Sequence, residues 1–341
     1  MTTSVLVPTH RTTPAALARV MQAASLASDD VEVVIVDNSG DARKRDVVGG
    51  LAGPRVKVVC TDVTDGVANA QRAFDESSGQ WIQWFADDDF ILDSGMRHLA
   101  ERARTFADGD GTVAACGGFL VESRAGIATL RYEGLDADRG VERLLRFVRT
   151  VGPNLLFYGV LKRDFVQTYM TVLSMLPFSL SYHDQVVSTL MLAVGRLRSI
   201  PQFVYLYDLG RWESREGSIS VDRGYLNTAG LPPACDRILW LMCGLEGARL
   251  LRSRAFAGLI GAEGVPMAEL WSLHNHAKLR ADPRGDGLAG TPGDEAAAAL
   301  RAKWCARASI EADEALDDVA GFLRDCGVAK ADAYHEFWSG L

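Results

Sequence analysis

The chain has 341 residues, of which 48% are hydrophobic and 23% are charged, so it can bury a sizeable core and does not have the composition of a disordered protein. Its formal net charge of −8 argues against sequence-independent binding to nucleic acid, whose backbone is also negative. No apolar run approaches the roughly 18 residues that span a bilayer, and MTTSVLVPTHR has a strand pattern instead of a signal-peptide pattern. We therefore expect a cytoplasmic protein without a transmembrane segment.

The first half of the chain predicts alternating strands and helices. Strands are expected at residues 4–8, 31–37, 55–62 and 80–86, and helices at residues 14–26 and 66–77. Several of these strands are continuous Val/Ile runs, which are typical of a parallel sheet covered on both faces. The alternation up to about residue 105 indicates a nucleotide-binding half-domain.

The second half is less regular and leads into a helical region. Strand-like segments are expected at 113–121 and 154–161, helices at 141–150, 164–175 and 184–194, and a last strand at FVYLYDLGRW before a Ser/Arg-rich loop over 211–223. From Pro232 onwards the pattern is helical, apart from a Gly/Pro-rich loop over 281–295. The predicted organisation is one α/β domain over residues 1–230, followed by a helical region over residues 231–341.

Three consecutive acids, Asp87, Asp88 and Asp89, follow the fourth expected strand. Open α/β sheets bind ligands at the carboxyl ends of their strands, and crowded carboxylates cost stability unless a cation or hydrogen-bond donors offset their charge. Mg²⁺ and Mn²⁺ take carboxylate oxygens and leave positions for substrate phosphates. A helix cap would explain one of these acids, but a single carboxylate suffices for a cap, so we favour a cation site.

The order of the motifs VLVPTHR, VVIVDNSGD and GVANAQRAFDESSGQWIQWFADDDF resembles the family 2 glycosyltransferases of the GT-A fold. In that family an opening strand ends in a Pro-Thr/Ser-x-x-Arg-like turn, a second strand ends in Val-Asp-Asn/Asp, and a Gly-x-x-x-Ala helix leads to an Asp-x-Asp motif. The resemblance spans residues 4–90. It implies a mostly parallel sheet flanked by helices, with a nucleotide-sugar-binding half over 1–112 and an acceptor half over 113–230.

The resemblance assigns a donor-site role to residues that match these motifs. Pro8, Thr9 and Arg11 match the turn that lines the nucleotide site, and Asp37 matches the acid that binds the base. Gly66 matches the start of the helix. Asp87 matches the acid near the ribose, and Asp89 matches the metal ligand. Asp88 is the alternative metal ligand if the register shifts by one residue. The helix departs from the family, since Gln71 and Arg72 stand where the family has Arg-Asn.

Two of these assignments have competing interpretations that the residues alone leave open. Asp37 could accept a hydrogen bond from a pyrimidine imide N–H, or it could close an Asx turn. Arg11 could neutralise phosphate, or it could be a solvated loop charge.

A second candidate site is Tyr182-His183-Asp184-Gln185, at the start of the expected helix 184–194. Inverting transferases of this fold place a carboxylate at such a helix start to take the acceptor proton, and Asp184 matches that location by resemblance. The family commonly has Glu-Asp there, whereas His183 takes the place of the Glu in this chain. An N-cap is the alternative for Asp184, and one residue can serve both roles. His183 could orient Asp184, contact the acceptor, or be structural.

Weaker candidates flank these two sites. Arg211 or Arg215 could stabilise a leaving diphosphate and Trp212 could stack on a sugar, although a charged surface loop explains them equally well. Asn154 and Tyr158 are candidate acceptor contacts.

The resulting hypothesis is a metal-dependent inverting glycosyltransferase that uses Mn²⁺ or Mg²⁺ and a nucleotide-diphosphate sugar, with a uridine or thymidine donor favoured. The alternatives are a nucleotidyltransferase, which usually has a Gly-rich loop that PTHRTTP lacks, and a non-catalytic nucleotide- or sugar-binding module. The acceptor is open. We expect the helical C-terminal region to shape the acceptor site or a homodimer contact.

Overall fold

The computed structural model describes residues 2–63, 65–106, 109–150, 153–210, 212–282 and 293–341. Contacts divide the chain into two compact units. The first contains Met1–Asp136, Gly152–Ser174 and Gly195–Gly210, and the second contains Ala137–Val151, Met175–Val194 and Arg211–Leu341. The expected boundary at residue 230 stays a prediction, and the units are described separately below.

A single sheet forms the centre of the first unit. Among the described residues it has nine strands in the order β3-β2-β1-β4-β8-β6-β9-β5, with β7 paired to β6. The strands are β1 (Thr3–Thr9), β2 (Val31–Asp37), β3 (Val56–Cys60), β4 (Trp81–Trp84), β5 (Phe90–Ile91), β6 (Thr112–Ser123), β7 (Gly126–Leu130), β8 (Val160–Lys162) and β9 (Arg196–Asp208).

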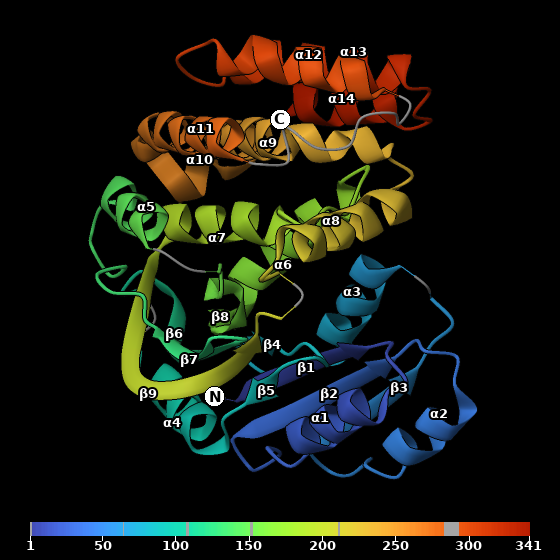
Figure 1. The fold of residues 1–341 in the computed structure, drawn as a ribbon. Coiled ribbons are helices and arrows are strands. Elements are labelled where there is room, and N and C mark those ends of the chain that lie inside the picture. Colours follow the sequence, from blue (N-terminus) through green and yellow to red (C-terminus); the bar gives the residue numbers. More distant parts are fainter. Residues whose placement is uncertain (1, 64, 107–108, 151–152, 211, 283–292) are drawn as a thin grey trace. The chain divides into compact units, whose positions relative to one another are not determined.

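The strands β3, β2, β1 and β4 run parallel to one another, as the Val/Ile-rich sequences of β2 and β3 predict. β2 is buried along its whole length. Figure 1 shows α1 (Pro14–Ala24) and α2 (Ala42–Gly49) on one face of these strands and α3 (Gly66–Glu76) on the other. β6 and β9 also pair in parallel, whereas β5, β7 and β8 pair antiparallel.

Side-chain caps start the first three helices. Thr13, Asp41 and Asp65 each accept a hydrogen bond from the backbone N–H three residues later, which satisfies a donor that the first turn leaves open. α2 was not predicted from the sequence, because only Lys44 and Val48 of its eight residues are buried and no apolar stripe marks it.

The expected strand at 154–161 is wrong in part. The structure has a 3-10 turn, η1 (Leu156–Tyr158), followed by the short strand β8. Gly159 lies between them, and a Cβ there would lie 2.6 Å from the carbonyl oxygen of Ala115. The chain therefore turns onto β6 at a position where only glycine allows so close an approach. The last strand is longer than predicted, since β9 begins at Arg196 and continues past Pro201, with register shifts against β6 at Cys116 and Gly118.

Two further helices belong to the first unit, α4 (Asp93–Ala103) and α6 (Arg163–Met175, except its last residue). α4 packs on β6, β8 and β9. Gly95 allows the close contact with β9, because a Cβ at this position would lie 1.9 Å from the carbonyl oxygen of Phe203.

The second unit is helical in the residues that the structure describes. Its helices are α5 (Gly140–Arg149), α7 (His183–Val194), α8 (Arg215–Ala229), α9 (Leu239–Arg252), α10 (Arg254–Ile260), α11 (Gly264–Ala281), α12 (Asp294–Cys305), α13 (Ala312–Asp325) and α14 (Ala331–Gly340), with 3-10 turns η2 (Pro233–Ile238) and η3 (Gly261–Glu263). α9 packs against α7, α11 and α13, and the fully buried Trp271, Trp304 and Trp338 fill the core.

The expected loop over 211–223 is wrong, because α8 occupies residues 215–229. Ser214 caps this helix by accepting the N–H of Gly217, and Gly230 ends it in the left-handed conformation (φ 71°). The segment is polar and carries little apolar periodicity, so the caps were its only local signal. Most of the expected loop over 281–295 lies outside the described residues.

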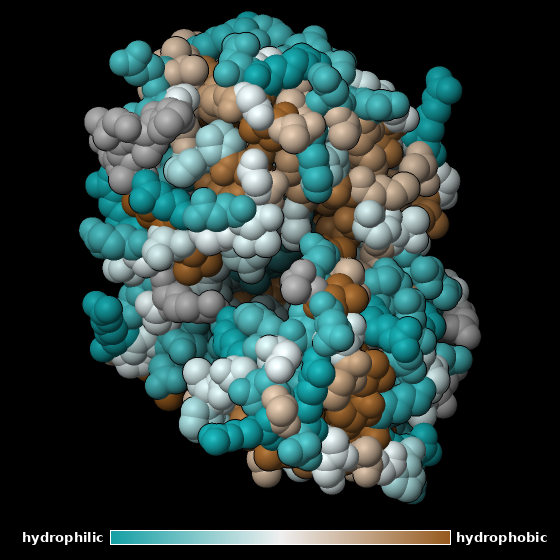
Figure 2. All heavy atoms as spheres, turned by 90° about the vertical axis from the view of Figure 1, so that its right-hand side faces the viewer, coloured by the Kyte–Doolittle hydropathy of each residue, from teal (hydrophilic) through white to brown (hydrophobic). Residues whose placement is uncertain are grey.

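No helix among the residues described is long and apolar enough to cross a membrane. Figure 2 shows hydrophilic side chains over most of the face that it presents, with smaller groups of apolar side chains among them.

Candidate active site

The three acids after β4 occupy different environments. The chain beyond β4 still follows β1, since Phe85 N donates to Leu6 O at 2.9 Å, and it then turns at Ala86 and Asp87. Asp87 and Asp89 are each 2% exposed, whereas the Asp88 side chain is 20% exposed. Asp88 is therefore the most accessible of the three carboxylates.

Arg11, just beyond β1, binds two of these acids. Its guanidinium pairs with Asp87 and with Asp88, where Nη2 lies 3.0 Å from Oδ2. The Thr9 hydroxyl also donates to Asp87 Oδ2 at 2.6 Å. Burial alone would raise the pKa of Asp87, but these hydrogen bonds and the Arg11 charge hold it below its ordinary value. Asp87 is thus an ionised, fully engaged carboxylate.

A buried lysine joins the ends of β1 and β2. Lys44 of α2 is 3% exposed, and its Nζ lies 2.9 Å from Asp37 Oδ1 and 2.8 Å from Thr9 Oγ1. Asp37 is 0% exposed and also accepts the N–H and hydroxyl of Ser39. Lys44 was not among the predicted site residues, and its position three residues after the Asp41 cap is its one local signal in the sequence.

Asp89 points to β9 and away from Arg11. Its Oδ2 accepts the Tyr205 hydroxyl at 3.2 Å, and its Oδ1 accepts the N–H of Asp208 at 2.9 Å. Burial and the charge of Asp88 raise the pKa of Asp89 to about 7. Tyr205 in turn stacks on Tyr158, with ring centroids 4.8 Å apart, so this candidate residue contacts a side chain bonded to Asp89.

The remaining candidates of the first unit lie on β1, at the start of α3 and just before η1. Pro8 is part of β1, and Gly66 is the first residue of α3. Asn69 of α3 donates to Val36 O at 3.3 Å, which ties the helix to the end of β2. Asn154 accepts the N–H of Leu156 at 3.4 Å.

The candidate base lies in the second unit. Asp184 is in the first turn of α7, and its Oδ1 accepts the N–H of Gln185 at 2.7 Å. His183 is buried and bonded within the unit. Trp212 precedes α8 and Arg215 is its first residue, while Arg211 lies outside the described residues.

The acidic run fits a hard divalent cation by the chemistry of its donors. The buried carboxyl of Asp89 lies beside the charge of Asp88, and a cation would offset both. Among the residues that the structure describes, no group of three or more His, Cys, Asp or Glu side chains could hold a metal. Mg²⁺ in proteins commonly has one or two carboxylate ligands, with substrate phosphates and water completing its shell. The run therefore suits a cation that a phosphate-bearing ligand shares.

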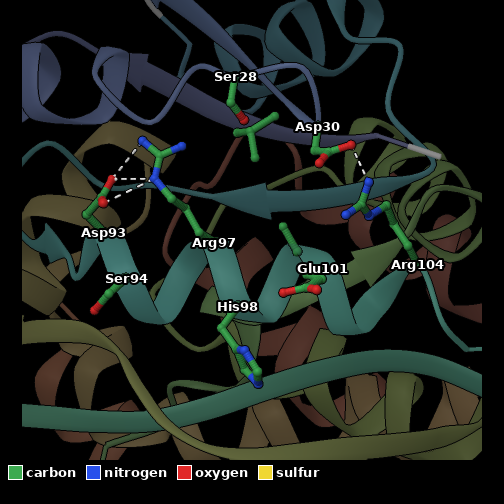
Figure 3. A pocket seen from close by; sticks show the side chains of 10 residues that line it. Ser28, Asp30, Asp93, Ser94, Arg97, His98, Glu101 and Arg104 are labelled. Carbon is green, nitrogen blue, oxygen red and sulfur yellow. Dashed lines mark hydrogen bonds and ion pairs between the residues drawn. The ribbon is translucent and has the colours of Figure 1, made fainter.

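A separate cleft of about 660 Å³ lies between α4 and the turn before β2 (Figure 3). Its two arginines are paired, Arg97 with Asp93 at 3.0 Å and Arg104 with Asp30. The figure shows both guanidinium groups turned toward these carboxylates. The cleft adjoins the amino end of β2, whereas the candidate residues gather at the carboxyl ends of the parallel strands, so we assign it no part in the site.

Comparisons with known proteins cover both sequence and fold. The family model for glycosyl transferase family 2 matches residues 4–133. A search of curated proteins finds no match. Residues 1–349 of S. aureus TarS in complex with UDP-GlcNAc match with a TM-score of 0.58 at 15% identity, over 99% of this chain and 91% of that one. A second crystal structure of TarS residues 1–349 matches with a TM-score of 0.56 at 13% identity, over 99% of this chain and 90% of that one. The expected fold class is confirmed.

Proposed function

We propose that this protein is a glycosyltransferase that moves a sugar from a nucleotide-diphosphate donor to an acceptor hydroxyl with inversion, because residues 4–133 match the family model for glycosyl transferase family 2 and the chain has the GT-A fold. One observation carries the donor half of this proposal. Arg11, Lys44, Asp37 and the run from Asp87 form one connected set of charges at the carboxyl ends of β1, β2 and β4. Ligands of open α/β sheets bind at that edge.

The donor in this proposal is a uridine or thymidine nucleotide sugar. The UDP-GlcNAc complex of TarS supports a nucleotide-sugar donor. Asp37 supports the choice of base: among the described residues Oδ1 accepts from Lys44 and Ser39 and Oδ2 from the Ser39 hydroxyl, so Oδ2 has a further lone pair for an imide N–H. Because this carboxylate is fully buried, the contact requires a local rearrangement around Asp37 when the base binds.

Asp89 would hold the divalent cation, with Asp88 as the alternative, and Asp87 would adjoin the ribose. When bound, Mg²⁺ or Mn²⁺ neutralises charge on the departing diphosphate. Arg11 is placed to contribute in the same way, since its guanidinium can exchange carboxylate for phosphate oxygens. Pro8, Thr9 and Gly66 would line the nucleotide, and Arg215 and Trp212 would contact the diphosphate and sugar.

The catalytic base in this proposal is Asp184. Its carboxylate takes the proton of the acceptor hydroxyl, the hydroxyl oxygen bonds to the anomeric carbon, and the bond from that carbon to the diphosphate oxygen breaks, which releases the nucleoside diphosphate. The first turn of α7 holds the carboxylate by the hydrogen bond from Gln185. Asn154 and Tyr158 would contact the acceptor.

Asp184→Asn tests the base without touching the donor residues. We expect turnover to fall about 10²- to 10⁴-fold, while UDP binding in the presence of Mn²⁺, measured by calorimetry, stays unchanged. Asp332→Asn, at an exposed acid of α14, is the matched control and should turn over normally. Normal turnover in Asp184→Asn would contradict the base assignment, and full activity after chelation of divalent metal would contradict the metal assignment.

A further inference from the structure

Glu246 of α9 is a buried carboxylate that the proposed reaction does not use. It is 1% exposed. Its Oε1 accepts the hydroxyls of Tyr182 at 2.8 Å and Tyr334 at 2.9 Å, and its Oε2 lies 3.3 Å from His183 Nε2. Burial and the charge of Glu246 raise the pKa of both tyrosines well above its ordinary value, so both remain donors at neutral pH. A buried carboxylate is costly unless it is hydrogen-bonded, and here neutral donors satisfy it.

The hydrogen bonds of His183 define its tautomer. Its Nδ1 accepts the backbone N–H of Leu180 at 3.2 Å, so the neutral ring carries its proton on Nε2. That proton points to Glu246 Oε2. Both ring nitrogens are therefore used inside the second unit, which favours an orienting role for His183 over contact with an acceptor.

The residue after Asp184 is fixed as well. The Gln185 side chain accepts from Lys278 Nζ of α11 at 2.9 Å, and the Lys278 ammonium lies 4.2 Å from the ring centroid of Trp240. Tyr182 and His183 are thus held on α9, and Gln185 is held on α11. Asp184 lies between two anchored neighbours in the first turn of α7.

We propose that Glu246 is a positioning residue for the catalytic base: by accepting from Tyr182 and His183 it sets the orientation of the first turn of α7, from which the Asp184 carboxylate projects. This inference rests on the proposed role of Asp184. A general base must lie within hydrogen-bond reach of the proton that it takes, and a shift of about 1 Å can lower a rate about 10²-fold.

Glu246→Gln tests the inference because it keeps the shape of the side chain and alters mainly its contact with His183 Nε2. The amide oxygen can still accept from Tyr182 and Tyr334, but the amide NH₂ then faces the N–H of His183, and two donors meet. We expect kcat to fall about 10- to 100-fold, while the KM for donor and the affinity for UDP with Mn²⁺ stay within about twofold. The ¹⁵N–¹H spectrum of the His183 ring should show the Nε2–H tautomer in the wild type and lose it in the variant.

Tyr334→Phe is the matched control, since it removes a donor to the same carboxylate from α14 and leaves the His183 contact intact. Its kcat should stay within about threefold of the wild-type value. His183→Gln provides a second route if Glu246→Gln does not fold, and it should lower kcat by a similar factor with donor binding retained.

An unchanged kcat in a folded Glu246→Gln or His183→Gln protein would overturn the inference, as would an equal loss in Tyr334→Phe. Failure of this inference differs from failure of the proposed function. If Asp184→Asn abolishes turnover and Glu246→Gln does not lower it, only the positioning role is wrong; if Asp184→Asn turns over normally, the base assignment itself is wrong.

Discussion

The ammonium of Lys44 lies 2.9 Å from Asp37 Oδ1, and this buried ion pair connects α2 to the end of β2. The same ammonium binds Thr9, whose hydroxyl donates to Asp87. Arg11 then pairs with both Asp87 and the accessible acid Asp88. Side chains of alternating charge are therefore connected from the interior of the sheet to its accessible edge. The side chains of the proposed donor site are thus bonded to one another, and a change at one should affect the others.

Lys44→Met should destabilise the protein by about 3–5 kcal/mol, because it leaves the fully buried Asp37 carboxylate without its cation. Urea denaturation measures the free energy of unfolding. Arg43→Met, at the exposed preceding residue of α2, should change it by about 0.5 kcal/mol or less. If Lys44→Met lowered the free energy of unfolding no more than this control does, the Lys44–Asp37 ion pair would add nothing to stability.

Arg11→Gln should separate metal binding from nucleotide binding. Because the guanidinium pairs with Asp87 and Asp88, its removal frees negative charge for a cation, and Mn²⁺ alone should bind more tightly. UDP in the presence of Mn²⁺ should bind about 10-fold more weakly, since a charge-assisted contact to phosphate is lost. The electron paramagnetic resonance signal of free Mn²⁺ measures the first affinity and calorimetry the second. Arg97→Gln on α4 is the control and should leave both affinities unchanged. Weaker binding of Mn²⁺ in Arg11→Gln would contradict the proposal that Arg11 exchanges carboxylate for phosphate oxygens.

The first half of the fold followed from local signals, since apolar runs marked β1 and β2 and helical patterns marked α1 and α3. The acids Asp37 and Asp87–Asp89 could be placed at strand ends for the same reason. Their partners could not be found in this way. Lys44 reaches Asp37 and Thr9 through the packing of α2 in the folded chain, and Tyr205 meets Asp89 across 116 residues of sequence. Glu246 lies 63 residues beyond His183, so its role depends on the packing of α7 and α9.

His274 of α11 should make the protein sensitive to acid. Burial and the nearby Lys278 charge lower the pKa of His274 from 6.5 to about 4. In the unfolded chain His274 binds a proton near pH 6.5, whereas in the folded chain it binds one only near pH 4. The neutral His274 therefore favours the folded state fully above pH 6.5, and this contribution to stability is lost as the pH falls from 6.5 to about 4. We expect about 2 kcal/mol of the wild-type loss in this window to disappear in His274→Asn. Urea denaturation at pH 7 and pH 4.5 measures the difference, and an identical pH dependence of the two proteins would contradict it.

Two glycines of the second unit make a matched test of its packing. A Cβ at Gly247 of α9 would lie 2.1 Å from Trp271 Nε1, and this indole donates to Cys243 O at 3.0 Å. Gly247→Ala should therefore displace a fully buried tryptophan and cost about 1–3 kcal/mol or more. At Gly258 of α10 an added Cβ meets nothing within 4 Å, so Gly258→Ala should stabilise the protein by about 0.5–1 kcal/mol through helix propensity. We expect Gly247→Ala to lower the melting temperature and Gly258→Ala to raise it. Equal changes in melting temperature would show that α9 and α11 do not pack as closely as these distances require.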